Sequence, residues 1–501
     1  MINKLTLKEP IDKLSVWLIG GFSILITGLV IGDKLCGDNC FLRKGPQVKN
    51  FTWEGETVNN TDRAFILTFD RPMDKETVEK NLVIDPPLPG KVSWAGRRLA
   101  YTTETPVPYG ETYTVQLNEA RERFRDSSKI GQEMEPFVGT FQSRDRALAY
   151  IGTQAEEKGK LVFYNITRQH KRALTPPDLV VMDFEFYPEG DRILFSAYDQ
   201  GLGIDGLRQL KLYTVTTGVS NGVEDSDNNV AGKIEEILDN ETYQNNQFDL
   251  SADGETIVIQ RVNRENPADF DLWMIKNGEK PERLKVAGGH FEITPDNKAL
   301  AVARGEGIGI LPLEPESEPL DFLPKFGQLL DFSLQGNSAA MVDFNTDNAN
   351  LRYTRSLFYV NNQGIQKELL NTQGSIVDCQ FTSTGNQLYC LLTELLKGDE
   401  YREQPYFARF DIRTGEVTPL AKLSDYQDIK ISLSPDGLAL LFDQVLTSDD
   451  TSLKDNLTNN SGQAIVGGKL WLLIPPISNN PNSKAELKQL PLVGFRPQWL
   501  P

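Results

Sequence analysis

The residues of this chain that best suit metal binding, by type and spacing, lie in an acidic segment between residues 219 and 236. Asp225, Asp227, Asn229 and Glu236 stand at the first, third, fifth and twelfth positions of a calcium-binding loop. The sixth position of such a loop needs glycine for a sharp turn and here holds Val230, and no helical pattern flanks the segment. The four residues are therefore a weak calcium candidate, with a solvated acidic loop as the alternative.

Serine and histidine form no recognisable catalytic arrangement. Residues 218–222 read GVSNG and match G-x-S-x-G, but a nucleophile elbow needs a strand, a sharp turn and a helix, and this segment runs into the acidic loop. We therefore assign no nucleophilic role to Ser220. Only two histidines occur, and we interpret His170 as an exposed turn residue and His290, beside two glycines, as structural. The sequence thus indicates no catalytic residue, no cofactor and no enzyme.

The four cysteines fall into two pairs. Cys36 and Cys40 lie in a polar Gly/Asp/Asn segment, whereas Cys379 and Cys390 flank a predicted turn centred between Thr384 and Gly385. In a hairpin the second pair would be cross-strand neighbours, close enough for a disulfide in an oxidising compartment. Two buried thiols that pack as small apolar groups are the alternative.

Composition excludes one class of partner. The chain has 501 residues, with 52 Lys and Arg against 70 Asp and Glu, which gives a net charge of −18. A strongly acidic protein repels phosphate backbones, so we expect no nucleic acid partner. The same charge keeps a protein soluble, and solubility requires no ligand.

Residues 14–32 form an uncharged apolar run of 19 residues, which predicts a single transmembrane helix. The run is longer than the apolar core of a signal peptide, and no Ala-x-Ala cleavage site follows it. Lysines and arginines are nearly balanced on the two sides, so charge alone does not set the orientation. We expect residues 1–13 in the cytoplasm and the folded domains outside.

After a polar linker at residues 33–47, residues 48–143 carry the pattern of a β-sandwich. Short alternating segments such as AFILTFD, GKVSWAG and ETYTVQLN are spaced as in all-β domains, and a short helical stretch is expected near Asp74. This unit resembles the bacterial Ig-like domain of surface-layer and other envelope proteins. The resemblance lies in FDRPMD at Phe69, Trp94, and the phrase PYGETYTV at Pro108. It implies an extracytoplasmic spacer or adhesive module, with Trp94 and Tyr113 as core and corner aromatics.

Residues 144–501 repeat one pattern of an apolar strand, a Pro/Asp/Gly turn and a second apolar strand. Copies begin at Phe184, Phe248, Phe291 and Ile431, and weaker copies at Phe332 and Cys379. Repeats with a period of about 40–50 residues are typical of β-propellers. We align the copies at the residue that follows the turn serine or its equivalent. In chain order these residues are Pro188, Ala252, Pro295, Gln335, Ser383 and Pro435. Proline, aspartate and glycine suit such turns, so Asp253, Asp296 and Asp436 are interpreted as turn residues.

A half copy, GFRPQWLP, ends the chain, and a strand without its partner, RALAYIG, opens this region. We expect the C-terminal strand to complete the first blade and close the ring, which removes free sheet edges. Seven blades are predicted, with six as the alternative. Outer strands are expected at segments such as KLVFYNIT and KLWLLIPP, and residues 219–236 and 446–468 are expected to be loop insertions.

The repeat with its Ser-Pro-Asp-Gly turns resembles the TolB-like, WD40-like propeller family, which implies a periplasmic interaction role. The predicted fold class is therefore all-β: a transmembrane helix, an Ig-like sandwich and a propeller. The chain departs from TolB because an anchor and an Ig-like unit stand in place of the family's N-terminal α/β domain, so TolB's own partners are not carried over.

Three functions fit this organisation. The first is a membrane-anchored extracytoplasmic binding or scaffold protein of the bacterial envelope, with a protein partner or a glycan. The second is a hydrolase or lyase that uses carboxylates of the propeller channel on a glycan or peptide. The third is an assembly or sensor factor for a membrane complex, in the plasma membrane or, in a photosynthetic bacterium, the thylakoid membrane.

Overall fold

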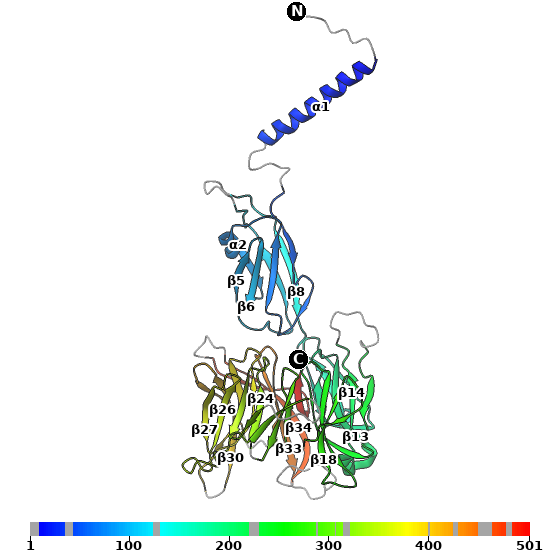
Figure 1. The fold of residues 1–501 in the computed structure, drawn as a ribbon, viewed down its shortest axis with the longest axis vertical. Coiled ribbons are helices and arrows are strands. Elements are labelled where there is room, and N and C mark those ends of the chain that lie inside the picture. Colours follow the sequence, from blue (N-terminus) through cyan, green and yellow to red (C-terminus); the bar gives the residue numbers. More distant parts are fainter. Residues whose placement is uncertain are drawn as a thin grey trace, which may run out of the picture. The chain divides into compact units, whose positions relative to one another are not determined.

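The structure is a computed structural model that describes residues 10–35, 44–123, 131–219, 230–286, 289–305, 307–313, 321–398, 401–423, 429–448, 463–476 and 483–501. The chain divides into two compact units. The first contains residues 1–56, 64–104 and 112–142, and the second contains residues 57–63, 105–111 and 143–501. Figure 1 labels their helices and strands.

The helix α1 (Pro10–Leu35) includes the run at residues 14–32 that the sequence predicts to be helical. Among its described side chains, Leu14, Trp17 and Ile24 are exposed. Within the part of the chain that the structure describes, no helix is long and apolar enough to cross a membrane.

The first unit is built around two antiparallel four-stranded sheets. The first sheet has the order β1 (Val48–Phe51), β3 (Ala64–Phe69), β6 (Arg98–Thr103) and β5 (Gly90–Ala95). The second has the order β2 (Thr57–Val58), β8 (Phe137–Ser143), β7 (Thr112–Leu117) and β4 (Leu82–Asp85), and its edge strand β2 consists of residues that belong to the second compact unit. The predicted strands of this unit are therefore present, and β1 and β2 are additional.

Aromatic side chains join the two sheets of this unit. The ring of Phe141 in β8 lies 6.3 Å from that of Phe51 in β1 of the other sheet, and 4.9 Å from Trp53 and 5.0 Å from Tyr113. Tyr113 is buried as predicted, but Trp94 is only half-buried, because it stacks on Phe69 at the sheet surface while its ring N–H donates to Glu79. The buried tryptophan of the core is Trp53.

The short helix α2 (Lys75–Asn81) follows the predicted start site. Asp74 is its N-cap, and its carboxylate accepts hydrogen bonds from the backbone N–H groups of Glu76 and Thr77. These bonds satisfy two of the free donors at the helix start, which is why aspartate is favoured there. The FDRPMD motif thus has a local structural role.

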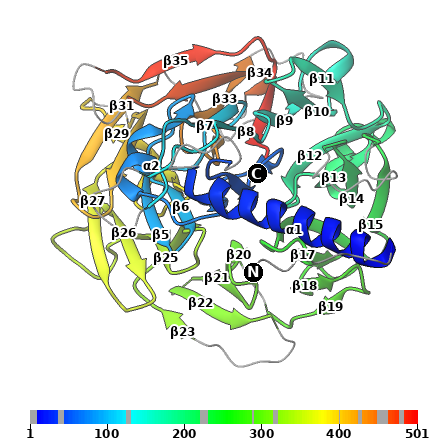
Figure 2. The same ribbon diagram turned by 90° about the horizontal axis from the view of Figure 1, so that it is seen from above.

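The second unit is a β-propeller of seven four-stranded antiparallel sheets, which Figure 2 shows around a common centre. In order from the inner to the outer strand, blades 1 to 3 are β36 (Gly494–Trp499), β9 (Ala147–Gly152), β10 (Leu161–Asn165), β11 (His170–Ala173); β12 (Leu179–Phe186), β13 (Arg192–Asp199), β14 (Lys211–Thr216), β15 (Ile234–Leu238); and β16 (Tyr243–Leu250), β17 (Thr256–Asn263), β18 (Phe270–Lys276), β19 (Glu282–Arg283).

Blades 4 to 7 follow the same order: β20 (Phe291–Ile293), β21 (Ala299–Arg304), β22 (Gly307–Pro312), β23 (Asp321–Leu323); β24 (Gln328–Phe332), β25 (Ser338–Asp343), β26 (Arg355–Asn361), β27 (Gln366–Thr372); β28 (Ile376–Phe381), β29 (Gln387–Leu395), β30 (Glu403–Asp411), β31 (Val417–Lys422); and β32 (Ile431–Leu433), β33 (Leu440–Ser448), β34 (Ala464–Ile474), β35 (Glu486–Gln489). Two 3₁₀ segments, η1 (Ala155–Glu157) and η2 (Gln200–Arg208), lie in the connections of blades 1 and 2.

The ring is completed by strands from opposite ends of this unit, as the split repeat predicts. β36 pairs antiparallel with β9, with Gly494 opposite Gly152 and Trp499 opposite Leu148. Trp499 also packs in an apolar cluster with Leu148, Tyr150 and Leu441, which belong to blades 1 and 7. The pairing supplies blade 1 with its inner strand.

The turns that join the inner and second strands have the predicted chemistry. In the turn of blade 7, the Asp436 carboxylate accepts hydrogen bonds from the Ser434 hydroxyl at 2.6 Å and the Leu438 N–H at 3.1 Å. Asp253 and Asp296 make equivalent bonds in blades 3 and 4. These aspartates are therefore turn residues.

Several details of the prediction are wrong. In blade 5 the residue after the turn serine, Ser333, is Leu334 rather than Gln335, because the Ser333 N–H donates to the Ser338 carbonyl across the turn. The segments expected to be outer strands are third strands, since a short fourth strand flanks each of them. The prediction missed these fourth strands because most are brief and polar.

Three more expectations need correction. His170 begins strand β11 rather than lying in a turn, although it is exposed as expected. The two predicted insertions are shorter than the sequence implied. Residues 234–236 belong to β15, and residues 446–448 and 464–468 belong to β33 and β34, because pairing with neighbouring strands extends these elements.

Blade 6 contains a disulfide between Cys379 in β28 and Cys390 in β29, which are directly paired across the two strands. Both residues are fully buried, within a cluster that also contains Leu388 and Phe410. The pair Cys36 and Cys40 lies outside the described residues.

We predict that Trp499→Ala lowers the free energy of unfolding of the propeller by about 3–5 kcal/mol, the usual cost of truncating a buried aromatic side chain. Trp499 is 5% exposed and lies on the strand that closes the ring. Guanidinium unfolding of the full chain, followed by circular dichroism, measures the change. Phe270→Ala is the matched control, because Phe270 is 41% exposed. Equal effects of the two variants would contradict the closing role.

Candidate functional site

One position is equivalent in the inner strands of all seven blades and is polar in each of them. It is the residue just before the last apolar residue of the strand, ahead of the turn. In blade order the residues at this position are Gln498, Glu185, Asp249, Glu292, Asp331, Gln380 and Ser432. We call them the channel ring, since inner strands surround the centre of the propeller in Figure 2. Blades 2 to 5 each contribute a carboxylate.

Six of the seven ring residues connect their blade to the next by hydrogen bonds. Each bond joins a ring side chain to a backbone group in the inner strand of the following blade. The pairs are Gln498 Nε2 to the Phe184 carbonyl (2.9 Å), Leu250 N–H to Glu185 (3.1 Å), Ile293 N–H to Asp249 (2.5 Å), Phe381 N–H to Asp331 (2.6 Å), Leu433 N–H to Gln380 (2.7 Å) and Trp499 N–H to Ser432 (3.1 Å). These bonds satisfy inner-edge donors and acceptors that no fifth strand covers.

Glu292 of blade 4 departs from this circuit. Among the described residues its carboxylate has no hydrogen-bond or ion-pair partner, and no bond joins it to blade 5. Burial and the nearby carboxylates of Asp331, Asp249 and Glu185 raise the pKa of Glu292 well above its ordinary value. Glu292 is therefore the ring carboxylate with full hydrogen-bonding capacity left for a ligand.

The other ring carboxylates also hold their protons more tightly than usual. Burial, the largest cause, raises the pKa of Glu185, Asp249 and Asp331. Asp378, two residues before the ring position in blade 6, has its pKa raised to about 7 by burial, although the Lys430 ammonium opposes the shift. A cationic ligand would reverse this effect, because a nearby positive charge favours the ionised carboxylates.

A β-bulge precedes the ring position in several inner strands. The pairing register shifts between Val181 and Asp183 in β12, between Leu329 and Asp331 in β24, and between Ile376 and Asp378 in β28. A bulge inserts one residue and re-aims the side chains that follow it. The polar residues Asp183 and Asp378 stand at these shifts, so the bulges position them.

Two basic residues lie on or beside the inner strands: Lys430 immediately precedes β32, and Arg496 stands in β36 two residues before Gln498. Arg496 in β36 has a φ of 52°, a left-handed conformation that non-glycine residues rarely adopt. Its Nη1 atom is 2.7 Å from Oδ1 of Asp183. Its backbone N–H donates to Oδ2 of Asp443 at 2.7 Å, while Oδ1 of Asp443 accepts from the Lys430 N–H at 2.7 Å. Asp443, 1% exposed, thus fixes the backbones that carry both cations.

His290, interpreted as structural from the sequence, also lies in this region. Its Nδ1 atom is 3.0 Å from Nε2 of Gln247, and desolvation together with the charge of Lys430 lowers its pKa. His290 is exposed, and it immediately precedes Phe291 at the start of an inner strand. It belongs to the rim of the channel rather than to the packed core.

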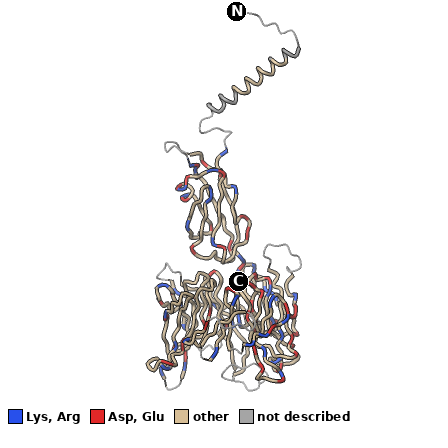
Figure 3. Tube along the Cα trace, viewed as in Figure 1, with Lys and Arg blue, Asp and Glu red and all other residues tan. Residues whose placement is uncertain are grey.

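A cavity of about 440 Å³ opens among the inner strands of blades 1, 2, 3, 6 and 7. Its lining includes the ring residues Glu185, Gln380, Ser432 and Gln498, together with Asp183. Elsewhere Lys and Arg alternate with Asp and Glu along the described chain (Figure 3). The ring differs because its four charged members are all acidic, and such a channel attracts cations.

The calcium candidate finds little structural support. Asp225, Asp227 and Asn229 lie outside the described residues, and Glu236 is a strand residue whose carboxylate pairs with the Lys211 ammonium at 3.0 Å. Across the described ranges, no group of three or more His, Cys, Asp or Glu side chains is arranged to hold a metal ion. Ser220 also lies outside the described residues.

The sequence contains a pattern that indicates the channel ring, but this ring was not predicted from the sequence. In the copies FEF, FDL and FEI, an acidic residue stands between two apolar residues that both belong to the core. Alignment of the repeats at this middle position would have shown polar residues in every blade. Their convergence follows only from the ring, since each acidic residue alone is an ordinary alternating strand position.

We predict that Asp378→Asn changes the pH dependence of stability. The native pKa of about 7 lies above the ordinary value of 3.8, so between these values the native state binds more protons than the unfolded state. The contribution of Asp378 is therefore present near pH 4 and is lost as the pH rises towards 7, by about 3 kcal/mol. Asparagine removes this slope. Urea unfolding of the native protein and the Asp378→Asn variant at pH 4.5, 6 and 7.5 measures how the free energy of unfolding changes with pH. An equal change in the two proteins would contradict the raised pKa of Asp378.

No protein-family profile and no curated protein sequence matches this chain. TolB from Acinetobacter baumannii has a TM-score of 0.39 at 13% identity, over 84% of this chain and 83% of its own. Oligogalacturonate lyase from Vibrio parahaemolyticus has a TM-score of 0.43 at 11% identity, over 60% and 88%. A hypothetical selenium-binding protein from Sulfolobus tokodaii has a TM-score of 0.44 at 10% identity, over 71% and 93%. At these TM-scores the likeness to solved structures carries no argument about family, ligand or activity, and the β-propeller fold rests on the seven four-stranded sheets.

Proposed function

We propose that this chain is a membrane-tethered extracytoplasmic binding protein whose channel ring holds a cationic segment of a partner protein. The observation that carries the proposal is the run of carboxylates from Glu185 to Asp331 on four consecutive blades. Lysine and arginine side chains are long enough to reach into a channel while their backbone stays at its rim. Acidic walls also speed the association of such a segment.

The distribution of charge along the channel supports a directed mode of binding. Glu292 has no hydrogen-bond or ion-pair partner among the described residues, whereas Asp183 is paired with Arg496, and each of these two stands two residues before the ring position of its strand. A basic side chain that enters the ring meets carboxylates whose protons it displaces. Arg496 and Lys430 are the cations closest in the sequence to the ring positions, and an acidic residue next to the basic segment would pair with them. The expected partner segment therefore carries clustered basic residues with an acidic residue beside them.

The tether rests on the sequence of residues 14–32, which contains no charge over 19 residues. Exposed apolar side chains along α1, such as Trp17 and Ile24, support it. The extracytoplasmic location is supported by the Cys379–Cys390 disulfide, since such bonds persist in oxidising compartments. The sandwich unit then serves as an Ig-like spacer between membrane and propeller. The same arrangement suits an assembly or sensor factor, in the plasma membrane or the thylakoid membrane.

A hydrolase or lyase is the second candidate, and Glu292 is the residue that favours it. A carboxyl group with a raised pKa can act as a general acid. This candidate expects turnover of a glycan or peptide that Glu292→Gln abolishes. The hydrolase or lyase would replace the binding proposal if two results were obtained. The native chain would turn over a substrate that the Glu292→Gln variant does not, and partner binding would not depend on the channel ring.

Neutralisation of the channel is the direct test of the binding proposal. We predict that Glu292→Gln, Asp331→Asn and Asp378→Asn together reduce the capture of the partner by at least about tenfold, which corresponds to 1.4 kcal/mol. The measurement is quantitative crosslinking of the tagged full chain in its native membrane. Because these carboxylates have raised pKa values, their amides do not weaken the fold, so lost capture is not unfolding.

The matched control removes the same charge elsewhere on the propeller. Glu255, Glu265 and Glu279 are exposed and lie outside the inner strands, and their change to glutamine should leave capture unchanged. Capture by the native protein and by this control should both fall with rising salt, whereas residual capture by the channel variant should not. If both triple variants lost capture equally, general acidity rather than the ring would be responsible.

The location of the propeller has its own test. We predict that Cys379 and Cys390 resist alkylation when the membrane-bound protein is unfolded in denaturant without reductant, and react fully after reduction. Mass spectrometry of the peptide that spans blade 6 reads the difference. Denaturant removes the protection that burial alone would give, so complete alkylation before reduction would place the propeller in a reducing compartment.

A further inference from the structure

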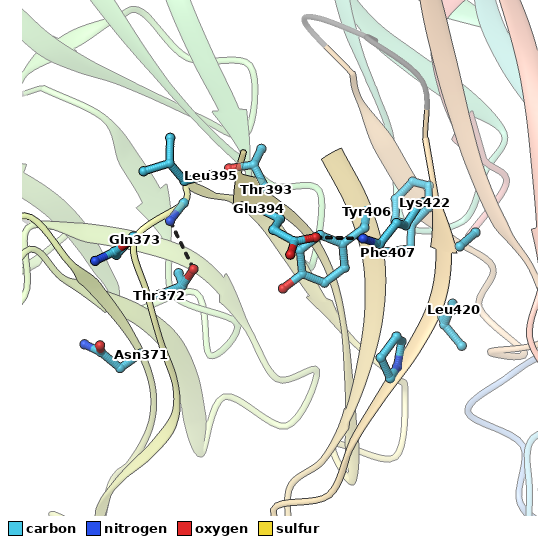
Figure 4. A pocket seen from close by; sticks show the side chains of 13 residues that line it. Asn371, Thr372, Gln373, Thr393, Glu394, Leu395, Tyr406, Phe407, Leu420 and Lys422 are labelled. Carbon is cyan, nitrogen blue, oxygen red and sulfur yellow. Dashed lines mark hydrogen bonds and ion pairs between the residues drawn. The ribbon is translucent and has the colours of Figure 1, made fainter. Parts of the chain in front are cut away.

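A long groove runs between blades 5 and 6, away from the channel ring. It consists of two cavities of about 640 and 390 Å³ that share the lining residues Gln373 and Leu395. Strands β27, β29, β30 and β31 contribute side chains to the larger cavity, which Figure 4 shows. Together the two volumes exceed that of a single small-molecule pocket of ordinary size. We call this surface the tyrosine groove.

Aromatic side chains give the groove its character. Tyr353 and Tyr401 line the smaller cavity and are 79% and 71% exposed, and Phe344 beside them is 41% exposed. Tyr406 lines the larger cavity and is half-buried. Aromatic rings are large apolar surfaces, and several that gather in one exposed groove mark an interaction site more often than scattered ones do.

The exposed position of Tyr353 is enforced by its backbone. Its φ is 72°, in the left-handed region that bulky residues rarely adopt. The following residue holds this turn, because the N–H and hydroxyl of Thr354 both donate to the Leu351 carbonyl, at 2.9 and 2.7 Å. The Arg352 guanidinium lies 5.2 Å from the Tyr353 ring centre. Strained backbone that fixes an exposed aromatic ring is typical of ligand-binding positions.

The polar lining of the groove is balanced in charge. Figure 4 shows the Glu394 carboxylate directed at the Lys422 ammonium, 2.7 Å away, beside the Tyr406 ring. Arg355 donates to the Gly374 carbonyl at 3.0 Å. Asn371 donates to Thr354 at 2.9 Å, which leaves its side-chain carbonyl as an acceptor. The groove thus offers paired charges and amides, in contrast to the channel ring with its acidic excess.

We propose that the tyrosine groove binds a neutral oligosaccharide. Sugar hydroxyls both donate and accept, so they can bond to Glu394 and Lys422 at once without separating the ion pair, and to the amides of Asn371 and Gln373. The apolar C–H face of a pyranose ring packs on an aromatic ring such as that of Tyr353. A charged ligand would compete with Glu394 or Lys422 for the other member of the pair, whereas a neutral ligand leaves the ion pair intact.

The lining favours a glycan over a peptide. Peptide partners insert anchor side chains into desolvated apolar pockets. In this groove the most exposed surfaces are flat rings, and the shared middle is formed by the amide of Gln373 beside Leu395. Glycan binding here rests on the extracytoplasmic location of the proposed function, where free and wall-bound glycans occur. Blade 6, which contains the disulfide, contributes strands β29, β30 and β31 to the groove.

The test is binding of the fluorescently labelled full chain, in detergent micelles, to an array of neutral six-residue oligosaccharides with α- and β-linked hexoses and N-acetylhexosamines. We expect binding to a subset of these glycans. Tyr401→Ala and Tyr353→Ala should each weaken it by about tenfold, since stacked aromatic contacts contribute about 0.5–1.5 kcal/mol beyond the area they bury. Tyr401→Phe keeps the ring and should retain binding.

Two control variants show whether glycan binding depends on the groove itself. Phe270→Ala removes an exposed aromatic ring outside the groove and should leave glycan binding unchanged. The channel variant with Glu292→Gln, Asp331→Asn and Asp378→Asn should also bind glycans normally, so failure of the channel proposal and failure of this one are distinguishable. No binding to any neutral glycan, binding to a proline-rich peptide alone, or glycan binding unchanged by both tyrosine variants would each overturn the proposal.

Discussion

The antiparallel pairing of β36 with β9 is the contact on which the rest of the propeller depends. It joins residues about 340 positions apart in the chain and supplies blade 1 with its inner strand. Without it, β9 would present an unpaired edge, and the channel ring would lack Gln498. Hydrogen bonds then link six of the seven blades to the blade that follows, through polar side chains at the ring position.

These bonds have an electrostatic consequence. A carboxylate is an effective acceptor for a backbone N–H, but several carboxylates in one enclosed channel repel each other and lose hydration. The structure holds them with raised pKa values, and the ring is therefore not the most stable arrangement of these charges. Glutamine in blades 1 and 6 shows that an uncharged side chain can make the same connection. An acidic residue is thus not required for the fold at this position, which makes its charge a candidate for function.

The two candidate surfaces of the propeller differ in their balance of charge. The channel ring concentrates one sign of charge and suits a cationic partner, whereas the tyrosine groove balances its charges and presents aromatic faces. They involve different blades for the most part, since the ring carboxylates belong to blades 2 to 5 and the groove to blades 5 and 6. A single rigid ring can therefore present a protein partner and a glycan with separate sites. Closed rings suit this role because their loops and rims vary without loss of the core.

The sequence by itself determined the all-β class, the sandwich strands and the seven-bladed closure, because each depends on local alternation and on turn chemistry. The Asp436 turn and the split repeat that ends in Trp499 are examples, since both can be recognised within a few residues. Only the tertiary structure decided which polar residues meet. Glu292 and Asp331 are neighbours only because successive inner strands converge on one axis, and Tyr353 and Tyr401 meet only because two blades pack side by side. The distances between strands of different blades are set by how the seven blades pack around the axis. The alternation of apolar and polar residues within one strand carries no information about that packing.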